Sequence, residues 1–395
     1  MSRPAALVIS PEAPYPMHGG GAIRTASLLH YLARCYDLDL ILFRQAGDSD
    51  PTLSLPPGLV RRSSTITLPF HSRRPLAWFL RNGRRWVLGA PPLLNRFSLQ
   101  GREIGSILRG RSYDAGMIEH FWCAPYIEQL APVCKRTVLD LHNIESELHA
   151  SSARSGSWPL SAAHQRFARS CMREERRWLP CFSRLLVTSE DDARRVRRSA
   201  PRALLTVYRN AIPMVHVPEE QEEHVIGFSG NFEYRPNMEG VRFFVKEVWP
   251  RLVSRLPDLK LRLIGKNPGA IAQYIKGAAG IEATGPVDNA IAELAKVKVA
   301  VVPLVSGSGT RLKILEAWAA ARPVVSTSLG AEGLGARPGI DLMLADTPDV
   351  FVASITDLLG SNKERRRIGC AARHTFEERF TWDAAWTSLE RDVFE

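Results

Sequence analysis

The chain has 395 residues, of which 45% are hydrophobic and 24% are charged, a composition typical of a folded, water-soluble protein. Its length exceeds what one hydrophobic core usually organises, so we expect two domains. The formal net charge of +11 predicts an anionic partner, which can be a phosphorylated substrate, an anionic membrane surface or nucleic acid.

The cysteines and the apolar runs indicate the compartment. Six cysteines are scattered without a CxxC pair or a framework spacing, which favours reduced thiols over disulfides or a zinc site. The apolar run at residues 5–10 is cut by Pro11 and Glu12, so we expect a first buried strand rather than a signal peptide. No apolar run approaches the roughly 20 residues that a membrane-spanning helix needs. These features predict a cytoplasmic protein.

Short apolar segments alternate with helical patterns along the first half, which predicts a parallel sheet with helices on both faces. The expected strands are 5–10, 38–43, 115–119, 137–141, 185–188 and 204–208. A glycine loop that includes Gly19 and Gly20 follows the first strand and precedes a helix from about Ala22. Bare backbone at this position can approach a ligand's phosphate, and an ordinary Pro/Gly turn is the alternative.

Two further patterns of the first half have competing interpretations. Asp37 and Asp39 match a DxD metal motif, but they alternate with leucines as a strand entrance does, so no metal site is predicted. Residues 61–111 and the expected helix 161–182 are rich in arginine beside aromatic and aliphatic residues. Such stretches are typical of a membrane interface or a single-stranded nucleic-acid site, and a solvated helical face is the alternative. Two of them in one domain favour an interfacial surface.

His142 follows the expected strand 137–141, so it should emerge at the carboxyl edge of the sheet, where open α/β sheets bind ligands. Residues 213–223 are rich in Pro and Glu and indicate a linker. A second series of strands follows, which predicts a second doubly wound domain. Its expected strands are 225–229, 261–264, 281–284, 299–303, 324–326 and 342–345.

The segment from Val305 to Glu316 combines a glycine-rich turn with a helix that opens near Thr310. Backbone N–H groups at such a helix start favour a phosphate, and Arg311 and Lys313 add positive charge beside it. Glu316 lies roughly two turns further on and could accept hydrogen bonds from a pair of sugar hydroxyls. The combination predicts a site for a nucleoside diphosphate.

With these residues in place, the chain resembles the GT-B glycosyltransferases of the large retaining family 4. The resemblance covers nearly the whole chain and is most specific at Gly307 to Ala319, Pro323 to Thr327, Gly330 to Leu334 and Thr284 to Asp288. It implies two Rossmann-like domains with the active site in the cleft between them. The domains are then 1–212, completed by a last helix at 381–395, and 224–380, with the linker 213–223 between them.

The resemblance also implies the site residues. Those expected to bind the donor are Gly19, Gly20, Asn231, Arg235, Gly285, Val287, Ser308, Gly309, Thr310 and Glu316. Among these, Glu316 matches an acid that binds the nucleotide ribose, and Gly309 and Thr310 match the turn that faces the diphosphate. His142 matches a histidine near the transferred sugar.

Two departures from the family pattern concern charge. The first acid of the E-x7-E signature falls on Ser308, and the usual basic pair after the first strand of the second domain falls on Asn231 and Asn237. Arg311 and Lys313, helped by Arg235, are expected to supply the missing positive charge. The expected catalytic residues are therefore His142, Arg311 and Lys313.

The implied reaction is metal-independent transfer of a sugar from a nucleoside diphosphate sugar to a hydroxyl acceptor with retention, and it needs no cofactor. The expected acceptor is a growing cell-surface glycan or its lipid-linked precursor. The anionic inner face of the cell membrane is a further expected partner, and no specific nucleic acid is expected. Two alternatives remain open. One is a related GT-B epimerase that releases a free sugar, and the other is a basic membrane- or nucleic-acid-binding protein with a degenerate donor site.

Overall fold

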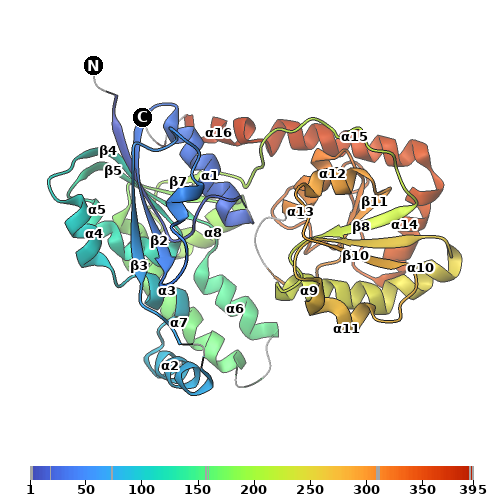
Figure 1. Ribbon diagram of the computed structural model, residues 1–395, viewed down its shortest axis with the longest axis horizontal. Helices are drawn as coiled ribbons and strands as arrows, with labels where there is room; N and C mark the ends of the chain where they lie inside the picture. The colour runs from blue at the N-terminus through green and yellow to red at the C-terminus, as the bar shows by residue number, and fades with distance from the viewer. Residues whose placement is uncertain are drawn as a thin grey trace. The chain divides into compact units, whose positions relative to one another are not determined.

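A computed structural model describes residues 3–17, 19–72, 74–155, 158, 160–307, 312–390 and 393. Contacts between residues divide the chain into two units (Figure 1). Unit 1 is Met1–Asn210 with Ala385–Glu395, and unit 2 is Ala211–Ala384. Over the described ranges, no helix is both long and apolar enough to cross a membrane.

Unit 1 contains a parallel sheet with the strand order β3-β2-β1-β4-β5-β6-β7. The strands are β1 (Ala5–Ser10), β2 (Asp37–Gln45), β3 (Arg62–Leu68), β4 (Tyr113–Glu119), β5 (Cys134–Leu141), β6 (Arg184–Val187) and β7 (Leu205–Val207). The helices are α1 (Gly20–Ala33), α2 (Pro75–Leu88), α3 (Pro92–Phe97), α4 (Gly101–Leu108), α5 (Ile127–Leu130), α6 (Glu145–Ser155), α7 (Leu160–Trp178), α8 (Glu190–Ser199) and α16 (Trp382–Glu390). Figure 1 shows α1 on one face of the sheet and α4 and α5 on the other, as right-handed crossovers require.

The core of unit 1 confirms the buried strands that the apolar runs predict. The middle of β1 is fully buried, with Val8 and Ile9 inaccessible to solvent, because helices cover both faces of the sheet. Strand β3 was not among the expected strands, since Arg62 to Thr65 carry no apolar run. Asp37 begins β2, and the buried Asp39 accepts hydrogen bonds from Tyr113 Oη (2.9 Å) and Arg61 Nε (3.0 Å).

Unit 2 contains a second parallel sheet with the order β10-β9-β8-β11-β12-β13. Its strands are β8 (Val225–Ser229), β9 (Lys260–Ile264), β10 (Ile281–Gly285), β11 (Val299–Val302), β12 (Val324–Ser326) and β13 (Met343–Leu344). Its helices are α9 (Arg235–Phe243), α10 (Trp249–Arg255), α11 (Ala272–Ile275), α12 (Ala290–Ala295), α13 (Leu312–Ala319), α14 (Pro348–Gly360) and α15 (Asn362–Arg379). All six strands agree with the expected positions to within a few residues. The two doubly wound sheets confirm the predicted fold class.

The segment from Pro213 to Glu223, the expected linker, is held against unit 2 by its carboxylates. Glu222 forms ion pairs with Arg322 and Arg365, and Glu223 pairs with Arg262 at 2.6 Å. Its end is thereby fixed beside the first strand of unit 2.

Candidate active site

The strand order places a candidate ligand site in each unit. In unit 1 the chain runs outward from β1 to β3 and then returns to the other side of β1 at β4. Unit 2 repeats this pattern around β8, with β9 on one side and β11 on the other. Open α/β sheets bind ligands at the carboxyl ends of the strands beside such a reversal. The side chains at these ends of β1, β4 and β5, and of β8, are therefore the candidates.

A buried ion pair between α1 and the end of β5 supports the unit 1 site. Arg24 of α1 is 1% exposed and donates to both carboxylate oxygens of Asp140, from Nε at 2.6 Å and from Nη2 at 2.5 Å. The same guanidinium donates to the Tyr208 carbonyl at 2.7 Å and to Asn210 Oδ1 at 2.8 Å. Although burial opposes ionisation, the charge of Arg24 lowers the pKa of Asp140. A negative charge is therefore fixed at the end of β5.

His142 is held by two carboxylates. Its Nε2 lies 2.7 Å from Glu119 Oε2 and 3.2 Å from Asp140 Oδ2, and all three side chains are buried. Burial opposes its positive charge, but the two carboxylates outweigh burial and raise the pKa of His142 to about 9. Burial and the charge of Asp140 raise the pKa of Glu119 to about 7. At neutral pH, His142 is therefore an imidazolium beside a carboxylate.

His120, directly after β4, lies on top of His142. The two rings stack with 3.6 Å between centroids, and Trp122 stacks on the other face of His120 at 4.2 Å. Its backbone has φ 63°, a conformation that a non-glycine residue adopts rarely and mostly at functional sites. Burial, followed by the charge of His142, lowers the pKa of His120 to about 4. At neutral pH the His120 imidazole is therefore uncharged. Its buried Nε2 has no hydrogen-bond partner among the residues that the structure describes.

The glycine loop lies next to His120. Glu12 Oε2 is 3.7 Å from His120 Nε2, and a Cβ on Gly21 would come within 2.6 Å of the same oxygen. Gly19 has φ 122°, and Gly20 begins α1. The structure thus brings the predicted Gly19, Gly20 and His142 to one edge of the sheet. The carboxylate of Glu12 lies there too, beside the first turn of α1.

Sequence reasoning did not select Glu119 and His120. Glu119 is the last residue of the expected strand 115–119 and His120 follows it, so two adjacent ionisable residues at a strand end were the available signal. What joins them to His142 is the pairing of β4 with β5, which sets Glu119 opposite Asp140. Glu119, Asp140 and His142 also present ligand atoms within 4.8 Å of one another, as a metal site would. Arg24 already engages both Asp140 oxygens, so an ion pair network describes this cluster better than a cation site.

The raised pKa of His142 predicts how stability depends on pH. Folding raises this pKa above the unfolded value near 6.5, so the stabilisation is complete below about pH 6.5 and is lost as the pH rises through about 9. We expect the free energy of unfolding to fall by about 3 kcal/mol over that window. Urea unfolding at a series of pH values measures it, and His142→Asn should remove most of the fall. An equal fall in that variant would contradict the assignment.

The unit 2 site contains Glu316 on α13. Its half-buried carboxylate accepts a hydrogen bond from Ser229 Oγ at the end of β8, at 3.2 Å. Burial raises the pKa of Glu316, and the charge of Lys313 partly opposes this. Lys313 Nζ lies 5.9 Å from the centroid of the Phe228 ring, so it too is on the β8 side of α13. The predicted pair Lys313 and Glu316 therefore lies at the ligand-facing end of β8.

The loop after β8 contains Asn231 and Asn237, the two positions where the resemblance implies a basic pair. Asn237 is buried and donates from Nδ2 to the Asn231 carbonyl at 2.8 Å, while Asn231 Oδ1 accepts from Asn267 Nδ2 at 3.0 Å. Asn237 Oδ1 is buried and has no partner among the described residues. Arg235 is exposed and forms an ion pair with Glu239 at 2.7 Å. The asparagines therefore shape this loop, and Arg235 would have to leave Glu239 to reach a diphosphate.

The remaining predicted donor residues are on the neighbouring strand ends. Gly285 ends β10 with φ 74°, and its carbonyl accepts from the Gly265 N–H at 3.2 Å; the half-buried Val287 follows in the loop. Gly230, Gly265 and Gly285 thus come together across three adjacent strands. The predicted Ser308, Gly309, Thr310 and Arg311 lie outside the described residues, and their roles stay predictions.

Gly265 should tolerate no side chain. Its φ is 137°, and a Cβ would lie 2.1 Å from the Gly230 carbonyl oxygen, which belongs to the loop at the end of β8. We expect Gly265→Ala to destabilise unit 2 by more than about 2 kcal/mol, measured by urea unfolding. Gly269→Ala is the matched control, because a Cβ there meets nothing within 4 Å. Equal stability of the two variants would show that the loop is more adaptable than its geometry indicates.

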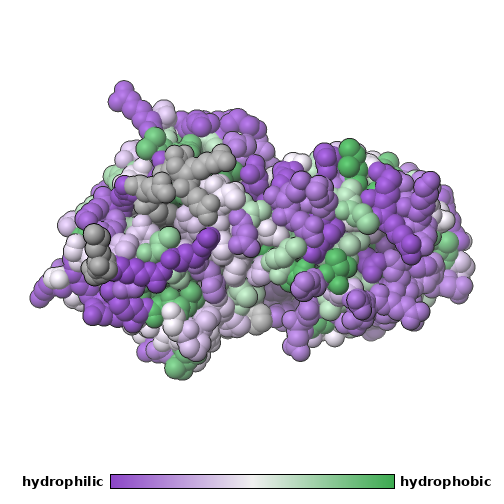
Figure 2. Space-filling view, turned by 90° about the horizontal axis from the view of Figure 1, so that it is seen from above, coloured by the Kyte–Doolittle hydropathy of each residue, from purple (hydrophilic) through white to green (hydrophobic). Residues whose placement is uncertain are grey.

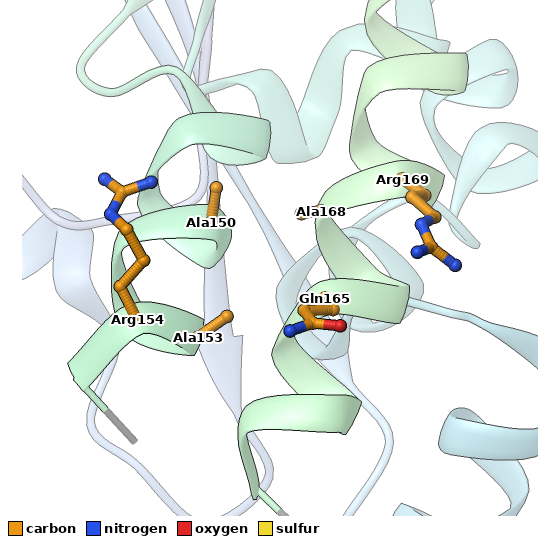
Figure 3. A pocket seen from close by; sticks show the side chains of 6 residues that line it. All are labelled: Ala150, Ala153, Arg154, Gln165, Ala168 and Arg169. Atoms are coloured by element: carbon orange, nitrogen blue, oxygen red, sulfur yellow. The ribbon is translucent and has the colours of Figure 1, made fainter. Parts of the chain in front are cut away.

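Hollows also lie in unit 1 outside the strand-end cluster. One, of about 290 Å³, separates α6 from α7; in Figure 3, Ala150 and Ala153 face Ala168 and Gln165 across it. Arg154 and Arg169 point away from it in the same view, so neither of these two lining arginines is directed into it.

The second hollow, of about 210 Å³, adjoins Trp122 and is largely apolar. Its polar lining includes Glu145, whose pKa burial raises to about 7 although Trp122 Nε1 donates to it at 2.9 Å. Because Trp122 also stacks on His120, this hollow is next to the unit 1 site.

Comparisons with known proteins agree with this geometry. Residues 223–361 match the family model of the glycosyl transferases group 1. Sucrose-phosphate synthase from Thermosynechococcus elongatus has the same fold, with a TM-score of 0.72 and 16% identity over 98% of each chain. Anabaena Alr3699/HepE in complex with UDP superposes with a TM-score of 0.70 and 13% identity, again over 98% of each chain. The whole chain thus has the GT-B fold, and the match to the glycosyl transferases group 1 lies in unit 2.

A relative of unknown activity covers the full length. An uncharacterized 44.6 kDa protein in the cps region of Klebsiella pneumoniae is 21% identical over 401 residues, which are 98% of this chain and 99% of the relative.

Proposed function

We propose that the chain transfers a sugar, with retention at the anomeric carbon, from a nucleoside diphosphate sugar to a hydroxyl of a cell-surface glycan or its lipid-linked precursor. The observation that carries the proposal is the carboxylate of Glu316, supported by Ser229 at the end of β8, at the strand reversal where such sheets bind nucleotides. Alr3699/HepE, which shares the fold, was solved with UDP and with UDP-glucose. Uridine donors are therefore the first to test.

In this proposal the two units contribute different groups. Glu316 accepts hydrogen bonds from the ribose, while Lys313, with Arg311 and the amides of Gly309 and Thr310, faces the diphosphate. The leaving diphosphate gains negative charge as the glycosidic bond breaks, so fixed cations stabilise the transition state more than the ground state. The acceptor hydroxyl attacks the anomeric carbon on the face from which the diphosphate leaves, and the hydroxyl proton passes to the departing phosphate oxygen.

The unit 1 cluster would serve the sugar end of the donor. His142 is charged and its Nε2 is fully engaged, so it supplies a fixed positive charge and orients His120 by stacking. The neutral His120, whose Nε2 makes no hydrogen bond among the described residues and lies 3.7 Å from Glu12 Oε2, can hydrogen-bond a sugar hydroxyl. The hollow beside Trp122 is a candidate place for the apolar part of an acceptor.

The biological role is inferred more broadly. The Klebsiella pneumoniae relative is in a cps region, which supports a role in polysaccharide synthesis. The basic arginine-rich stretches of unit 1 support peripheral association with the inner face of the cell membrane.

Nucleotide release tests the proposal. The full chain is incubated with UDP-, GDP-, ADP- and CDP-sugars in the presence of a glycolipid extract, and the released nucleotide is quantified. We expect nucleotide release from donors of one base class only. This release should require the extract and should be lost in Glu316→Ala. NMR of the product should show that the α or β configuration of the donor is kept. An inverted product would refute retention, and release of free sugar without any acceptor would favour the epimerase alternative.

A further inference from the structure

Helix α2 (Pro75–Leu88) exposes its apolar face and buries an arginine, the reverse of a surface helix in a water-soluble domain. Leu76, Phe79, Leu80 and Val87 occupy one stripe of the helix, and each is at least 62% exposed. Arg85, on the opposite side of the helix, is buried at 9% exposure. A helix packed only by its own domain would be rotated by half a turn. The outward apolar stripe therefore indicates that something other than water covers it.

Further exposed apolar side chains are close to this stripe in the sequence. Trp86 and Leu88 of α2 are exposed, as are Phe70 before the helix and Leu99 after α3. By contrast, the face of the molecule in Figure 2 is mainly hydrophilic, with apolar side chains in small groups. An apolar concentration of this kind marks a contact surface.

An arginine layer lies beneath α2, formed by Arg81, Arg85 and Arg96. Arg81 donates from Nη1 to the Ser72 carbonyl at 3.0 Å, Arg85 donates from Nε to Asn95 Oδ1 at 3.3 Å, and Arg96 contacts His71 Nδ1. No carboxylate within the described part of the chain forms an ion pair with these three arginines, and the buried Arg81 Nε has no hydrogen-bond partner there. Burial, followed by the neighbouring arginines, lowers the pKa of Arg85. These cations therefore lack the counter-charge that partly buried arginines usually have.

The local sequence keeps acids away from this layer. The segment from Pro51 to Arg102 contains nine arginines and no aspartate or glutamate. The helix is attached to α7, another arginine-rich helix, because Arg166 Nη2 donates to the Val87 carbonyl at 2.6 Å. An arginine of α7 therefore also contacts α2, in addition to the arginine layer.

We propose that α2 lies in the interface of an anionic membrane, with its apolar stripe in the acyl boundary and the arginine layer at the depth of the lipid phosphates. Interfacial amphipathic helices have this arrangement, with the apolar face about 5–10 Å below the headgroups. An anionic bilayer covers apolar atoms and supplies counter-charge together. A second copy of the chain would cover the apolar stripe but bring no counter-charge to the arginine layer, and a nucleic acid would leave Leu76, Leu80 and Val87 without an apolar partner.

This inference deepens the membrane part of the proposed function and rests on that part alone, whatever sugar is transferred. Flotation of the full chain with vesicles tests it. We expect binding to phosphatidylcholine vesicles that contain phosphatidylglycerol, weaker binding at high salt, and little binding to phosphatidylcholine alone.

The decisive variant carries Leu76→Ser, Phe79→Ser and Leu80→Ser. Because these side chains are exposed, the fold should be kept, and the fraction bound to anionic vesicles should fall at least about tenfold. The matched control carries Leu53→Ser, Leu204→Ser and Val350→Ser, three exposed apolar residues elsewhere, and should float as the wild type does. Circular dichroism checks that both variants are folded.

Three results would overturn the proposal. The first is equal flotation of the α2 variant and the wild type, and the second is failure of the wild type to bind anionic vesicles at low salt. The third is a concentration-dependent dimer in solution that the α2 variant abolishes, which would assign the stripe to contact between copies. Nucleotide-induced thermal stabilisation should be the same in the wild type and the α2 variant. Its absence in both would count against the donor site and leave the flotation result standing.

Discussion

Replacing Arg24 by methionine should destabilise unit 1 by about 3–5 kcal/mol, because the change leaves the buried carboxylate of Asp140 without its main counter-charge. Both side chains are almost inaccessible to water, and Arg24 also holds the Tyr208 carbonyl and Asn210. Urea unfolding of the full chain measures the effect. Much of the loss should return in the double variant Arg24→Met with Asp140→Leu, since no uncompensated charge is then buried.

Arg194→Met is the control for this experiment. Arg194 forms an exposed ion pair with Asp191, and such pairs contribute at most about 1 kcal/mol. Similar losses in Arg24→Met and Arg194→Met would show that the buried pair is not the support for the unit 1 site that its geometry indicates.

The second large effect is expected at His120. His120→Ala should lower the rate of sugar transfer by about two orders of magnitude or more, because it removes a positioned hydrogen-bonding group at the sugar end of the donor. His142→Ala should also lower the rate, through loss of the imidazolium and of the stack that orients His120. Initial rates with a responsive donor measure both.

Nucleotide binding separates a catalytic loss from a folding defect. The proposed ribose contact is in unit 2, so UDP should stabilise His120→Ala and the wild type equally. Near wild-type turnover in His142→Ala would refute its proposed role, and the same result in His120→Ala would remove that residue from the site.

The parts of the fold that the sequence predicts well are those set by burial. Parallel strands covered on both faces appear as continuous apolar runs, as at residues 5–10 and 299–303, and local pattern alone identifies them. Strand β3 was missed because it is an edge strand that begins with Arg62-Ser-Ser-Thr and is defined by pairing with β2. An edge strand needs less apolar sequence than a central one.

The candidate site was predicted only in part, because its geometry depends on pairing between distant segments. His142 was selected from its strand end, yet its partner Glu119 follows from the register of β4 against β5. For α2, the alternation of arginine and apolar residues was visible in the sequence. Periodicity alone does not show which side of a helix faces the domain. Surface helices of water-soluble domains bury their apolar side, so the sequence alone would have placed that side of α2 inward.

The most direct test of the central claim is a thermal-shift panel of UDP, GDP, ADP and CDP with the wild type and Glu316→Ala. A nucleotide at a hundred times its dissociation constant should stabilise the wild type by about 2.7 kcal/mol. We expect that one nucleotide, with UDP the first candidate, stabilises the wild type and has little effect on Glu316→Ala. Equal stabilisation of both proteins, or of neither, would contradict a donor site built on Glu316.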